Sequence, residues 1–386
     1  MTIKVANITE DGRWVGPQIR IAKVAEKLQA VHNIDTVVVC PEKDSKRLQR
    51  QLTNTEVSCR PVSLHHLTRH VPELMRYVVF LLPEIVHLVN VLRNETVDVV
   101  HCNGPWQIKG LVAAKIAGIP AVWHLNDTRA HPAVKLAFNI LAPILATGFI
   151  AASHRTKQYY LNTEWTEERP IRIIQAPVDT NEFDPCQTQP SPVLEEYDGL
   201  RIVTVGSVNP RKGLDVLINA ANILQACSKL TETVHFFIVG PIYESQRDYG
   251  NQLRQVVESK NLNVHFLGYS DEVPEILKGS DIYVCSSNNE ASPTAVWEAM
   301  AMEVPIVSTD VGDVSVFLEE NEPAGLIVPP GDPGGLANAI LSLIEDCMKR
   351  GQFSKNAREV AISELNLDAC AYRHAKMYRE LIEVSG

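Results

Sequence analysis

Two carboxylates, Glu290 and Glu298, bracket the stretch of the sequence with the clearest chemical signal. Between them Ser292, Pro293 and Thr294 form a typical helix start, because Ser is a good N-cap and Pro suits the first helical position. The free N–H groups of a helix's first turn, together with the helix dipole, attract an anion. We therefore predict a phosphate-binding helix start with one carboxylate before it and one inside the helix.

The second carboxylate, Glu298, needs a hydrogen-bonding partner. From Ala295 to Met302 every other residue is apolar, so we predict that this helix is buried. A buried carboxylate without a partner costs on the order of several kcal/mol, and a pair of ligand hydroxyls would supply the partner. The alternative is that Glu298 pairs with a structural Arg or Lys and that Glu290 is a solvated loop acid. The spacing alone leaves both interpretations open.

Two adjacent cations, Arg211 and Lys212, mark a second candidate phosphate site. They lie in a polar loop that begins at Gly206, after the expected strand 201–205, and that precedes a helix start at Leu214. Two cations at a strand end are well placed to neutralise a diphosphate. An exposed basic turn is the alternative. The neighbouring phosphate-binding helix start, at the end of the same expected sheet, favours the phosphate site.

His124 ends another expected strand, and His101, Asn126 and Asp127 are close to such strand ends too. His124 could be a core histidine with its hydrogen bonds satisfied, or it could belong to a polar cluster at these strand ends, and the sequence leaves both interpretations open. The sequence has no Asp-x-Asp pair and no His/Glu cluster at the spacing of metal ligands, so we expect no metal ion. It also lacks the glycine-rich fingerprints of dinucleotide sites and P-loops and the Gly-x-Ser-x-Gly of α/β-hydrolases, so we expect no cofactor.

The length of 386 residues is typical of two domains, and 45% hydrophobic and 21% charged residues are typical of a soluble globular protein. The net charge of −10 disfavours a nucleic-acid-binding protein. Residues 1–184 carry 21 Lys and Arg against 18 Asp and Glu, whereas the remainder carries 15 against 28. The N-terminal half is therefore the part suited to approach an anionic surface.

Eight cysteines occur without a Cys-x-x-Cys pair, which indicates core thiols in a reducing compartment. The N-terminus enters a strand-like run at Ile3 without the pattern of a secretory signal, so we expect a cytoplasmic protein. Residues 136–152 are expected to form a buried helix and then a buried strand. The apolar run 77–92 follows several Arg and His residues. It could form a surface helix that touches a membrane or a helix of the core, and we favour the core helix.

Short β-branched runs alternate with helical segments along the chain. Continuous apolar runs between turn residues fit parallel strands buried on both faces, and the alternation predicts doubly wound, Rossmann-like α/β sheets. The pattern stops between Pro177 and Gly199, where we place a linker between two such domains facing each other across a cleft. The expected strands are 4–8, 36–40, 97–101, 121–125, 148–152, 171–175, 201–205, 234–239, 264–267, 281–285, 305–308 and 325–328.

Together these residues resemble the retaining glycosyltransferases of family 4 type in the GT-B superfamily, over nearly the whole chain. The E-x7-E signature of that family matches Glu290 and Glu298, its Arg-Lys-Gly step matches residues 211–213, and its strand-end histidine matches His124. Segments 98–101, 117–120, 177–183, 281–284 and 309–312 are also similar. The chain departs from the family in three places. It has His101-Cys102-Asn103 where His-x-His is usual, and Gly312-Asp313 where Gly-Gly is usual. The N-terminal loop of the family usually carries two glycines, and here Gly12 and Gly16 are separated by Trp14 and its neighbours.

The resemblance implies an N-terminal acceptor-binding domain, 1–184, on which a C-terminal helix at about 371–386 packs back, and a nucleotide-sugar-binding domain, 185–370. It implies that Glu298 accepts from the ribose hydroxyls and that Glu290 contacts the transferred sugar. Arg211 and Lys212 would hold the diphosphate, and His124 would lie near the anomeric carbon. The backbone at Gly16, Gly206, Ser292, Pro293 and Thr294 would complete the donor site.

The resemblance thus implies a metal-independent, retaining hexosyltransferase without a cofactor. It would use a UDP- or GDP-sugar and a glycan or lipid-linked acceptor in the biosynthesis of polysaccharides or glycoconjugates of the cell surface. Contact of the N-terminal domain with the inner face of the membrane is kept as an alternative to a purely cytoplasmic location. A GT-B-fold sugar-nucleotide epimerase and a non-catalytic sugar-nucleotide-binding subunit are the rival functions.

Overall fold

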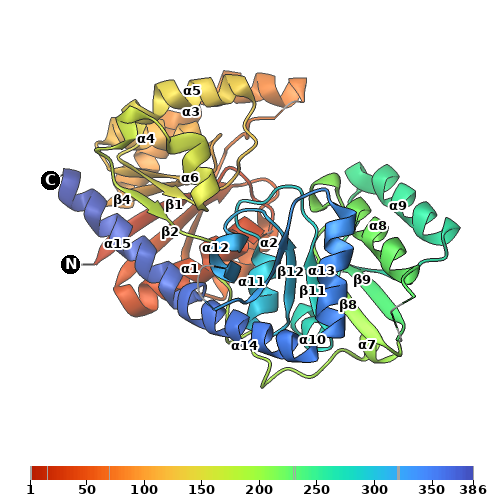
Figure 1. The fold of residues 1–386 in the computed structure, drawn as a ribbon. Helices are drawn as coiled ribbons and strands as arrows, with labels where there is room; N and C mark the ends of the chain where they lie inside the picture. The colour runs from red at the N-terminus through yellow and green to blue at the C-terminus, as the bar shows by residue number, and fades with distance from the viewer. Residues whose placement is uncertain are drawn as a thin grey trace. The chain divides into compact units, whose positions relative to one another are not determined.

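The computed structural model describes residues 2–14, 16–68, 70–228, 230, 232–319 and 322–385 of the chain (Figure 1). The chain divides into two compact units. The first runs up to Ala176 and takes up the C-terminal segment from Leu367, and the second is Pro177–Asn366. Each unit is built on its own parallel sheet with helices around it, which confirms the predicted α/β class of two Rossmann-like domains.

The first unit contains a seven-stranded sheet in the order β3-β2-β1-β4-β5-β6-β7, with parallel pairing throughout its described strands. The order reverses between β1 and β4, and in such sheets ligands bind at the carboxyl ends of the strands at this switch point. The strands are β1 (Ile3–Ile8), β2 (Ile34–Pro41), β3 (Ser58–Val62), β4 (Val99–Asn103), β5 (Ala121–Leu125), β6 (Gly148–Ala151) and β7 (Ile171–Ile173).

Helices cover this sheet, and the last helix of the chain belongs to it. The buried side chains His374, Tyr378 and Leu381 of α15 pack on the first unit. Ion pairs Lys27–Asp368 at 3.0 Å and Arg172–Glu380 at 2.6 Å fasten the same helix. The helices are α1 (Gly16–His32), α2 (Lys46–Thr53), α3 (Val71–Asn94), α4 (Ile108–Ala117), α5 (Pro132–Leu145), α6 (His154–Leu161) and α15 (Leu367–Ser385).

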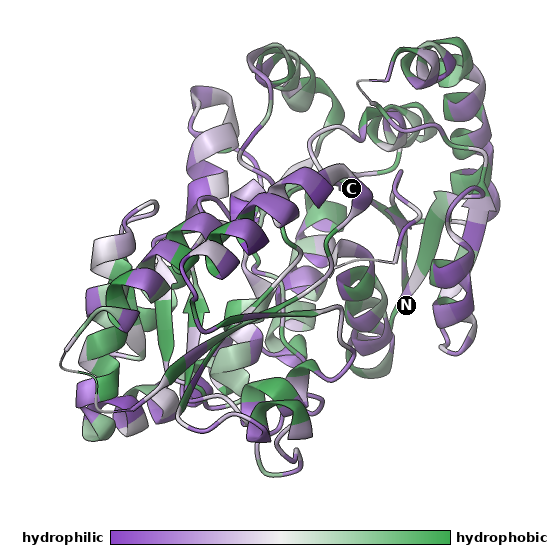
Figure 2. Ribbon diagram, turned by 90° about the vertical axis from the view of Figure 1, so that its right-hand side faces the viewer, coloured by the Kyte–Doolittle hydropathy of each residue, from purple (hydrophilic) through white to green (hydrophobic). Residues whose placement is uncertain are grey.

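The second unit contains a six-stranded parallel sheet in the order β10-β9-β8-β11-β12-β13, with its switch point between β8 and β11. The strands are β8 (Leu200–Val205), β9 (Val234–Val239), β10 (Val264–Gly268), β11 (Ile282–Cys285), β12 (Ile306–Thr309) and β13 (Gly325–Val328). The helices are α7 (Pro192–Glu195), α8 (Leu214–Gln225), α9 (Arg247–Ser259), α10 (Val273–Lys278), α11 (Thr294–Ala301), α12 (Val314–Glu319), α13 (Pro333–Glu345) and α14 (Cys347–Glu364). The strands of the sheets are largely green, for hydrophobic residues, in Figure 2.

The units divide after Ala176, before the end of the domain predicted as 1–184, and the C-terminal segment returns at Leu367 rather than at 371. Residues 177–184 already pack on the second unit. The backbone N–H of Val178 donates to the carbonyl of Leu365 at 2.8 Å, and the guanidinium of Arg358 donates to the carbonyl of Phe183 at 2.8 Å. These bonds explain why the polar, aperiodic stretch expected to be a linker is part of the second unit.

Two apolar helices differ from the expectation of burial. Helix α3, expected in the core over 77–92, packs Ile85, Leu88, Val89 and Leu92 into the core of the first unit and leaves its other side exposed. Helix α5 likewise exposes Leu136, Ile140 and Ile144, although β6 after it is buried as expected. By length and composition α3 could cross a membrane, and 28% of its most apolar window is buried. Its exposed large side chains are Val71, Met75, Val78, Val79, Phe80, Leu82 and Val86.

Candidate functional site

The loops that follow β8 and β11 are bonded to each other at the switch point of the second sheet. A single 3-10 turn, Pro210–Lys212, carries the two cations, and the side chain of Asn209 caps it by accepting from the N–H of Arg211 at 3.0 Å. From the other loop, the N–H of Asn288 donates to the carbonyl of Arg211 at 2.8 Å, and the hydroxyl of Ser286 donates to the carbonyl of Lys212 at 2.9 Å. These bonds fix the backbone of the cationic turn.

Two glycines allow this close approach. Gly213 has a φ of +59°, and a Cβ on it would lie 2.1 Å from the carbonyl oxygen of Ser286. Gly206 has a φ of +152°, and a Cβ there would lie 2.8 Å from Cε of Lys212. Both backbone conformations favour glycine. Gly206 therefore leaves the space in which the side chain of Lys212 lies.

Lys212 and Glu290 form an ion pair within the second unit. Nζ of Lys212 lies 2.8 Å from Oε1 of Glu290, and their side chains are 20% and 12% exposed. The hydroxyl of Ser287 donates to the same carboxylate oxygen at 3.1 Å. Glu290 is therefore not the solvated loop acid of the alternative interpretation. Arg211, by contrast, is exposed.

Helix α11 begins at Thr294, later than predicted. Pro293 occupies the N-cap position, and Ser292 does not cap the helix. The indole N–H of the buried Trp297 donates to Oγ of Ser292 at 3.1 Å instead, because a buried indole N–H requires an acceptor. The predicted cap and the predicted first-turn proline are therefore wrong by one position, and Pro293 at the N-cap makes no side-chain hydrogen bond to the helix start.

The two carboxylates of the E-x7-E pair lie around one buried tyrosine. Burial raises the pKa of Tyr283, and the negative charges of Glu298 and Glu290 add to the increase. Val296, Trp297, Ala299 and Met300 of α11 are buried as predicted, whereas Glu298 is only partly buried. Glu298 is thus less buried than its neighbours on the helix. Arg211, Lys212, Glu290, Glu298 and residues 292–294 are thus all in one unit.

His124 and Gly16 belong to the first unit. His124 is wholly buried in β5, with Nε2 at 2.9 Å from the guanidinium of Arg20 and Nδ1 at 3.1 Å from Nε2 of His101. Gly16 is the exposed first residue of α1, and a Cβ on it would meet no atom within 4 Å. The fold of the unit alone therefore does not demand glycine at this position. The expected roles of both residues toward the substrate stay predictions.

Three buried histidines cluster in this unit, and His374 was not expected beside His101 and His124, since it is far from them in the sequence. The ligand atoms of His101, His124 and His374 all lie within 4.8 Å of one another. Burial lowers the pKa of all three imidazoles below the ordinary value, and Nδ1 of His101 is 2.7 Å from the hydroxyl of Tyr378. Because the Arg20 guanidinium contacts His124, its charge opposes the binding of a cation, and the cluster fits a neutral hydrogen-bonded core better than a metal site.

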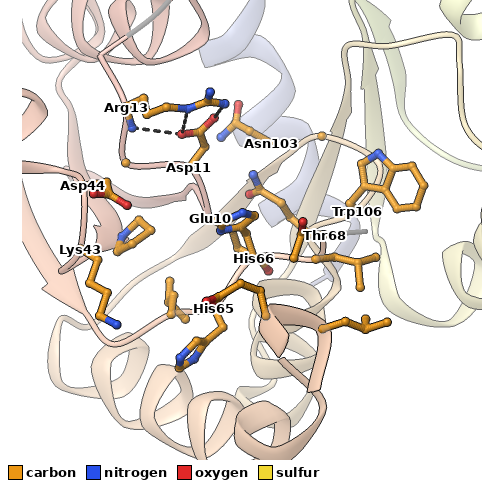
Figure 3. Close-up of a pocket in the computed structure, with 18 of the residues that line it drawn as sticks. Glu10, Asp11, Arg13, Lys43, Asp44, His65, His66, Thr68, Asn103 and Trp106 are labelled. Atoms are coloured by element: carbon orange, nitrogen blue, oxygen red, sulfur yellow. Dashed lines mark hydrogen bonds and ion pairs between the residues drawn. The ribbon is translucent and has the colours of Figure 1, made fainter. Parts of the chain in front are cut away.

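A cavity of about 1060 Å³ lies at the switch point of the first sheet. Glu10, Asp11 and Arg13 enter it from the loop after β1, and Lys43 and Asp44 from the loop after β2 (Figure 3). Further lining residues are His65, His66, Leu67, Thr68, Leu74, Asn103, Trp106, Gln107, His131 and Val134. Arg13 and Asp11 form a bidentate pair with bonds of 3.0 and 2.7 Å. No motif in the sequence signalled these residues.

Two family models match the chain. Residues 15–182 match the model described as Glycosyltransferase Family 4, and residues 188–360 match Glycosyl transferases group 1. The chain is 26% identical over 315 residues to the Escherichia coli UDP-Gal:alpha-D-GlcNAc-diphosphoundecaprenol alpha-1,3-galactosyltransferase, covering 77% of this chain and 79% of that protein. It is 22% identical over 304 residues to the alpha-D-kanosaminyltransferase of Streptomyces kanamyceticus, covering 73% and 76%.

Solved structures share the fold. A glycosyltransferase from Rickettsia africae superposes with a TM-score of 0.82 at 17% identity and covers 99% of both chains. Anabaena HepE, solved in complex with UDP and glucose, superposes with a TM-score of 0.78 at 20% identity and covers 97% of this chain and 98% of its own.

Proposed function

Since the chain belongs to the group 1, family 4 glycosyltransferases and has their GT-B fold, we propose that it transfers a hexose from a nucleotide-diphosphate sugar to a glycan or lipid-linked acceptor with retention of configuration. The observation that carries the donor assignment is the cationic turn, bonded to the loop of Glu290 that leads into α11. UDP is the first nucleotide to test, because HepE was solved with it.

Each donor contact follows from the chemistry of one group. The exposed Arg211 and the N–H groups at Ser292–Thr294 would bind the phosphates. Lys212 would exchange its ion pair with Glu290 for an ion pair with the phosphates. Glu298 would accept from both ribose hydroxyls, one at each carboxylate oxygen. As the diphosphate departs it gains negative charge, and fixed cations stabilise that charge without a metal ion or a covalent nucleophile.

A nucleotide panel tests the donor site. UDP or GDP at about 100 times its dissociation constant should stabilise the protein by about 2.7 kcal/mol, seen as a raised melting temperature. Lys212→Ala should lose most of that shift, whereas Lys260→Ala, which removes an exposed cation of the same unit, should keep it. Equal shifts in both variants would contradict the diphosphate assignment. Analysis of the sugar product separates the rivals: a new glycosidic linkage excludes the epimerase, and its absence despite nucleotide binding favours the non-catalytic subunit.

We also propose that the protein works in the cytoplasm and contacts the membrane through the exposed apolar side of α3. Seven large apolar side chains are exposed on this helix, and residues 1–184 are the basic part of an otherwise acidic chain. Both features favour an anionic bilayer. Leu82→Ser with Val86→Ser should reduce sedimentation with vesicles containing phosphatidylglycerol, whereas Val31→Ser, at an exposed apolar residue of α1, should not. Unchanged sedimentation of the α3 variant would contradict the proposal.

A further inference from the structure

Two thiols, those of Cys40 and Cys59, are in contact on neighbouring strands of the first unit. Cys40 is a wholly buried residue near the end of β2, and Cys59 is a partly exposed residue of the edge strand β3. Their sulfur atoms lie 3.6 Å apart, and in the described part of the chain this is the one contact between two cysteine sulfurs. All eight cysteines are free, so both thiols of the pair are available for chemistry.

The strand register explains why these two side chains meet. Strands β2 and β3 are parallel, and Cys59 is paired with Val38, so Cys40 lies two residues further along β2. Side chains alternate between the two faces of a sheet with a period of two residues, and Cys59 and Cys40 therefore point to the same face. On that face they adjoin a small apolar cluster that includes Ile21 of α1 and Leu48 of α2.

The surroundings make Cys59 the more reactive thiol of the pair. The hydrogen bond from the Cys40 thiol lowers the pKa of Cys59, burial opposes this, and the charge of Arg60 adds to the lowering. The same hydrogen bond and burial raise the pKa of Cys40. The thiolate is the nucleophile in cysteine chemistry, so Cys59 is the sulfur suited to react first. Its partial exposure on an edge strand lets a small reagent reach it.

We propose that Cys40 and Cys59 are a peroxide-sensitive modification site that closes into a reversible disulfide between β2 and β3. The Cys59 thiolate attacks one oxygen of hydrogen peroxide and breaks the O–O bond. Cys59 becomes a sulfenic acid, and the released hydroxide takes up the proton that Cys59 had lost and becomes water. The Cys40 sulfur then attacks the Cys59 sulfur, and the hydroxyl group leaves with the Cys40 proton as a second water. The two thiols lose two electrons, which reduce the peroxide.

Closing the bond requires a local movement of the edge strand. Sulfur atoms in a disulfide lie about 2 Å apart, so the pair must approach by roughly 1.5 Å. Strand β3 is the last strand in the order of the described sheet, so no further strand of that sheet holds its outer side. A disulfide that forms only with such a shift is more easily reduced than an unstrained one, which suits a reversible modification in a reducing compartment.

Both strands lead directly into the lining of the first-unit cavity. Lys43 and Asp44 follow β2, and residues 64–68 follow β3 (Figure 3). The disulfide therefore changes the segments that shape this cavity. The inference does not depend on the proposed glycosyl transfer, because it rests on contacts of the first unit alone.

Counting thiols on the full-length protein tests the inference. The wild type is exposed briefly to a small excess of hydrogen peroxide, unfolded and alkylated with N-ethylmaleimide. It should have two fewer alkylatable thiols than the eight of the untreated protein. Peptide mass analysis should show residues 40 and 59 joined with the loss of two hydrogen atoms. Dithiothreitol should restore the full thiol count.

Single substitutions assign the roles of the two sulfurs. In Cys40→Ser, Cys59 should stop at the sulfenic acid, which dimedone traps, because the second thiol is missing. In Cys59→Ser, Cys40 should stay alkylatable, because a buried thiol with a raised pKa does not attack peroxide. The matched control is Cys186→Ser, which removes an exposed cysteine of the second unit and should leave the disulfide unchanged.

Hydrogen exchange measures the movement of the edge strand. The bond should slow exchange of the backbone amides of β3 severalfold, because it opposes local opening, and dithiothreitol should reverse the change. A full count of alkylatable thiols after peroxide, or a wild-type sulfenic acid that never becomes a disulfide, would overturn the inference. A disulfide that is lost in Cys186→Ser would overturn it too, as would unchanged exchange of β3 in a protein that carries the bond.

Discussion

Replacement of Glu10 by Gln should stabilise the first unit at alkaline pH much more than at acidic pH. Burial raises the pKa of this acid from 4.5 to about 8. Between these two values the folded state holds a proton that the unfolded state has released. The free energy of unfolding therefore falls by about 1.4 kcal/mol for each pH unit across this window. The destabilisation is absent below the unfolded value and complete above the folded value.

The magnitude is large enough to measure. Between about pH 6 and about pH 9 the wild type should lose about 2.7 kcal/mol of unfolding free energy through Glu10 alone, a loss that Glu10→Gln does not share. For a unit of this size the melting temperatures of the two proteins should diverge by roughly 5–10 °C over that range. Differential scanning calorimetry measures the difference, and Glu73→Gln should track the wild type. Parallel pH curves for wild type and Glu10→Gln would refute the electrostatic reasoning.

Four further outcomes test the donor site. Arg211→Ala or Lys212→Ala should lower turnover about a hundredfold to a thousandfold with the fold intact, as expected for a lost charged contact to the transition state; normal steady-state rates in both would remove the phosphate assignment. EDTA should leave transfer unchanged, and rescue by manganese or magnesium after its loss would show that a metal is required. Glu298→Gln should weaken donor binding by about 1–3 kcal/mol, and 2′- or 3′-deoxyribose donors should lose little more with that variant. The effects of Lys212→Ala and Glu290→Gln on donor affinity should be non-additive, because the two side chains are paired in the free protein.

The sheets, and the meeting of the loops that carry Lys212 and Glu290, could be predicted because their signals are local. A parallel strand buried on both faces is a continuous apolar run, and β5, β9 and β13 were located to the residue. Strand β3 was not predicted, because Ser58, Arg60 and Pro61 interrupt the apolar pattern and the strand lies at the sheet edge with most of its residues exposed. Edge strands are covered on fewer sides, so their sequences carry less of the pattern.

The first-unit cavity and the histidine cluster could not be predicted, because tertiary structure alone assembles them. His101 and His374 are distant in sequence and meet only when α15 packs on the first sheet. Glu10 carries no signal either: an acid after a strand is ordinary, and its raised pKa arises from burial, to which the charge of Glu84 adds. The exposed face of α3 was not predicted for a related reason. Apolar composition predicts that a helix is covered, but it does not say which surface covers each of its sides.

In the proposed donor site the Lys212–Glu290 pair would make recognition of the diphosphate and recognition of the sugar interdependent. In the free protein each group satisfies the other at 2.8 Å, in a partly buried place where an unpaired charge would be costly. A diphosphate offers Lys212 more negative charge than one carboxylate does, so the exchange of partners is favourable. In the proposed site Glu290 would then be released and would need new donors, which the hydroxyls of the transferred sugar would supply. A nucleotide without its sugar would leave Glu290 with the hydroxyl of Ser287 as its donor among the described contacts. The site should therefore favour the complete nucleotide sugar over the bare nucleotide by more than the sugar's own contacts would suggest.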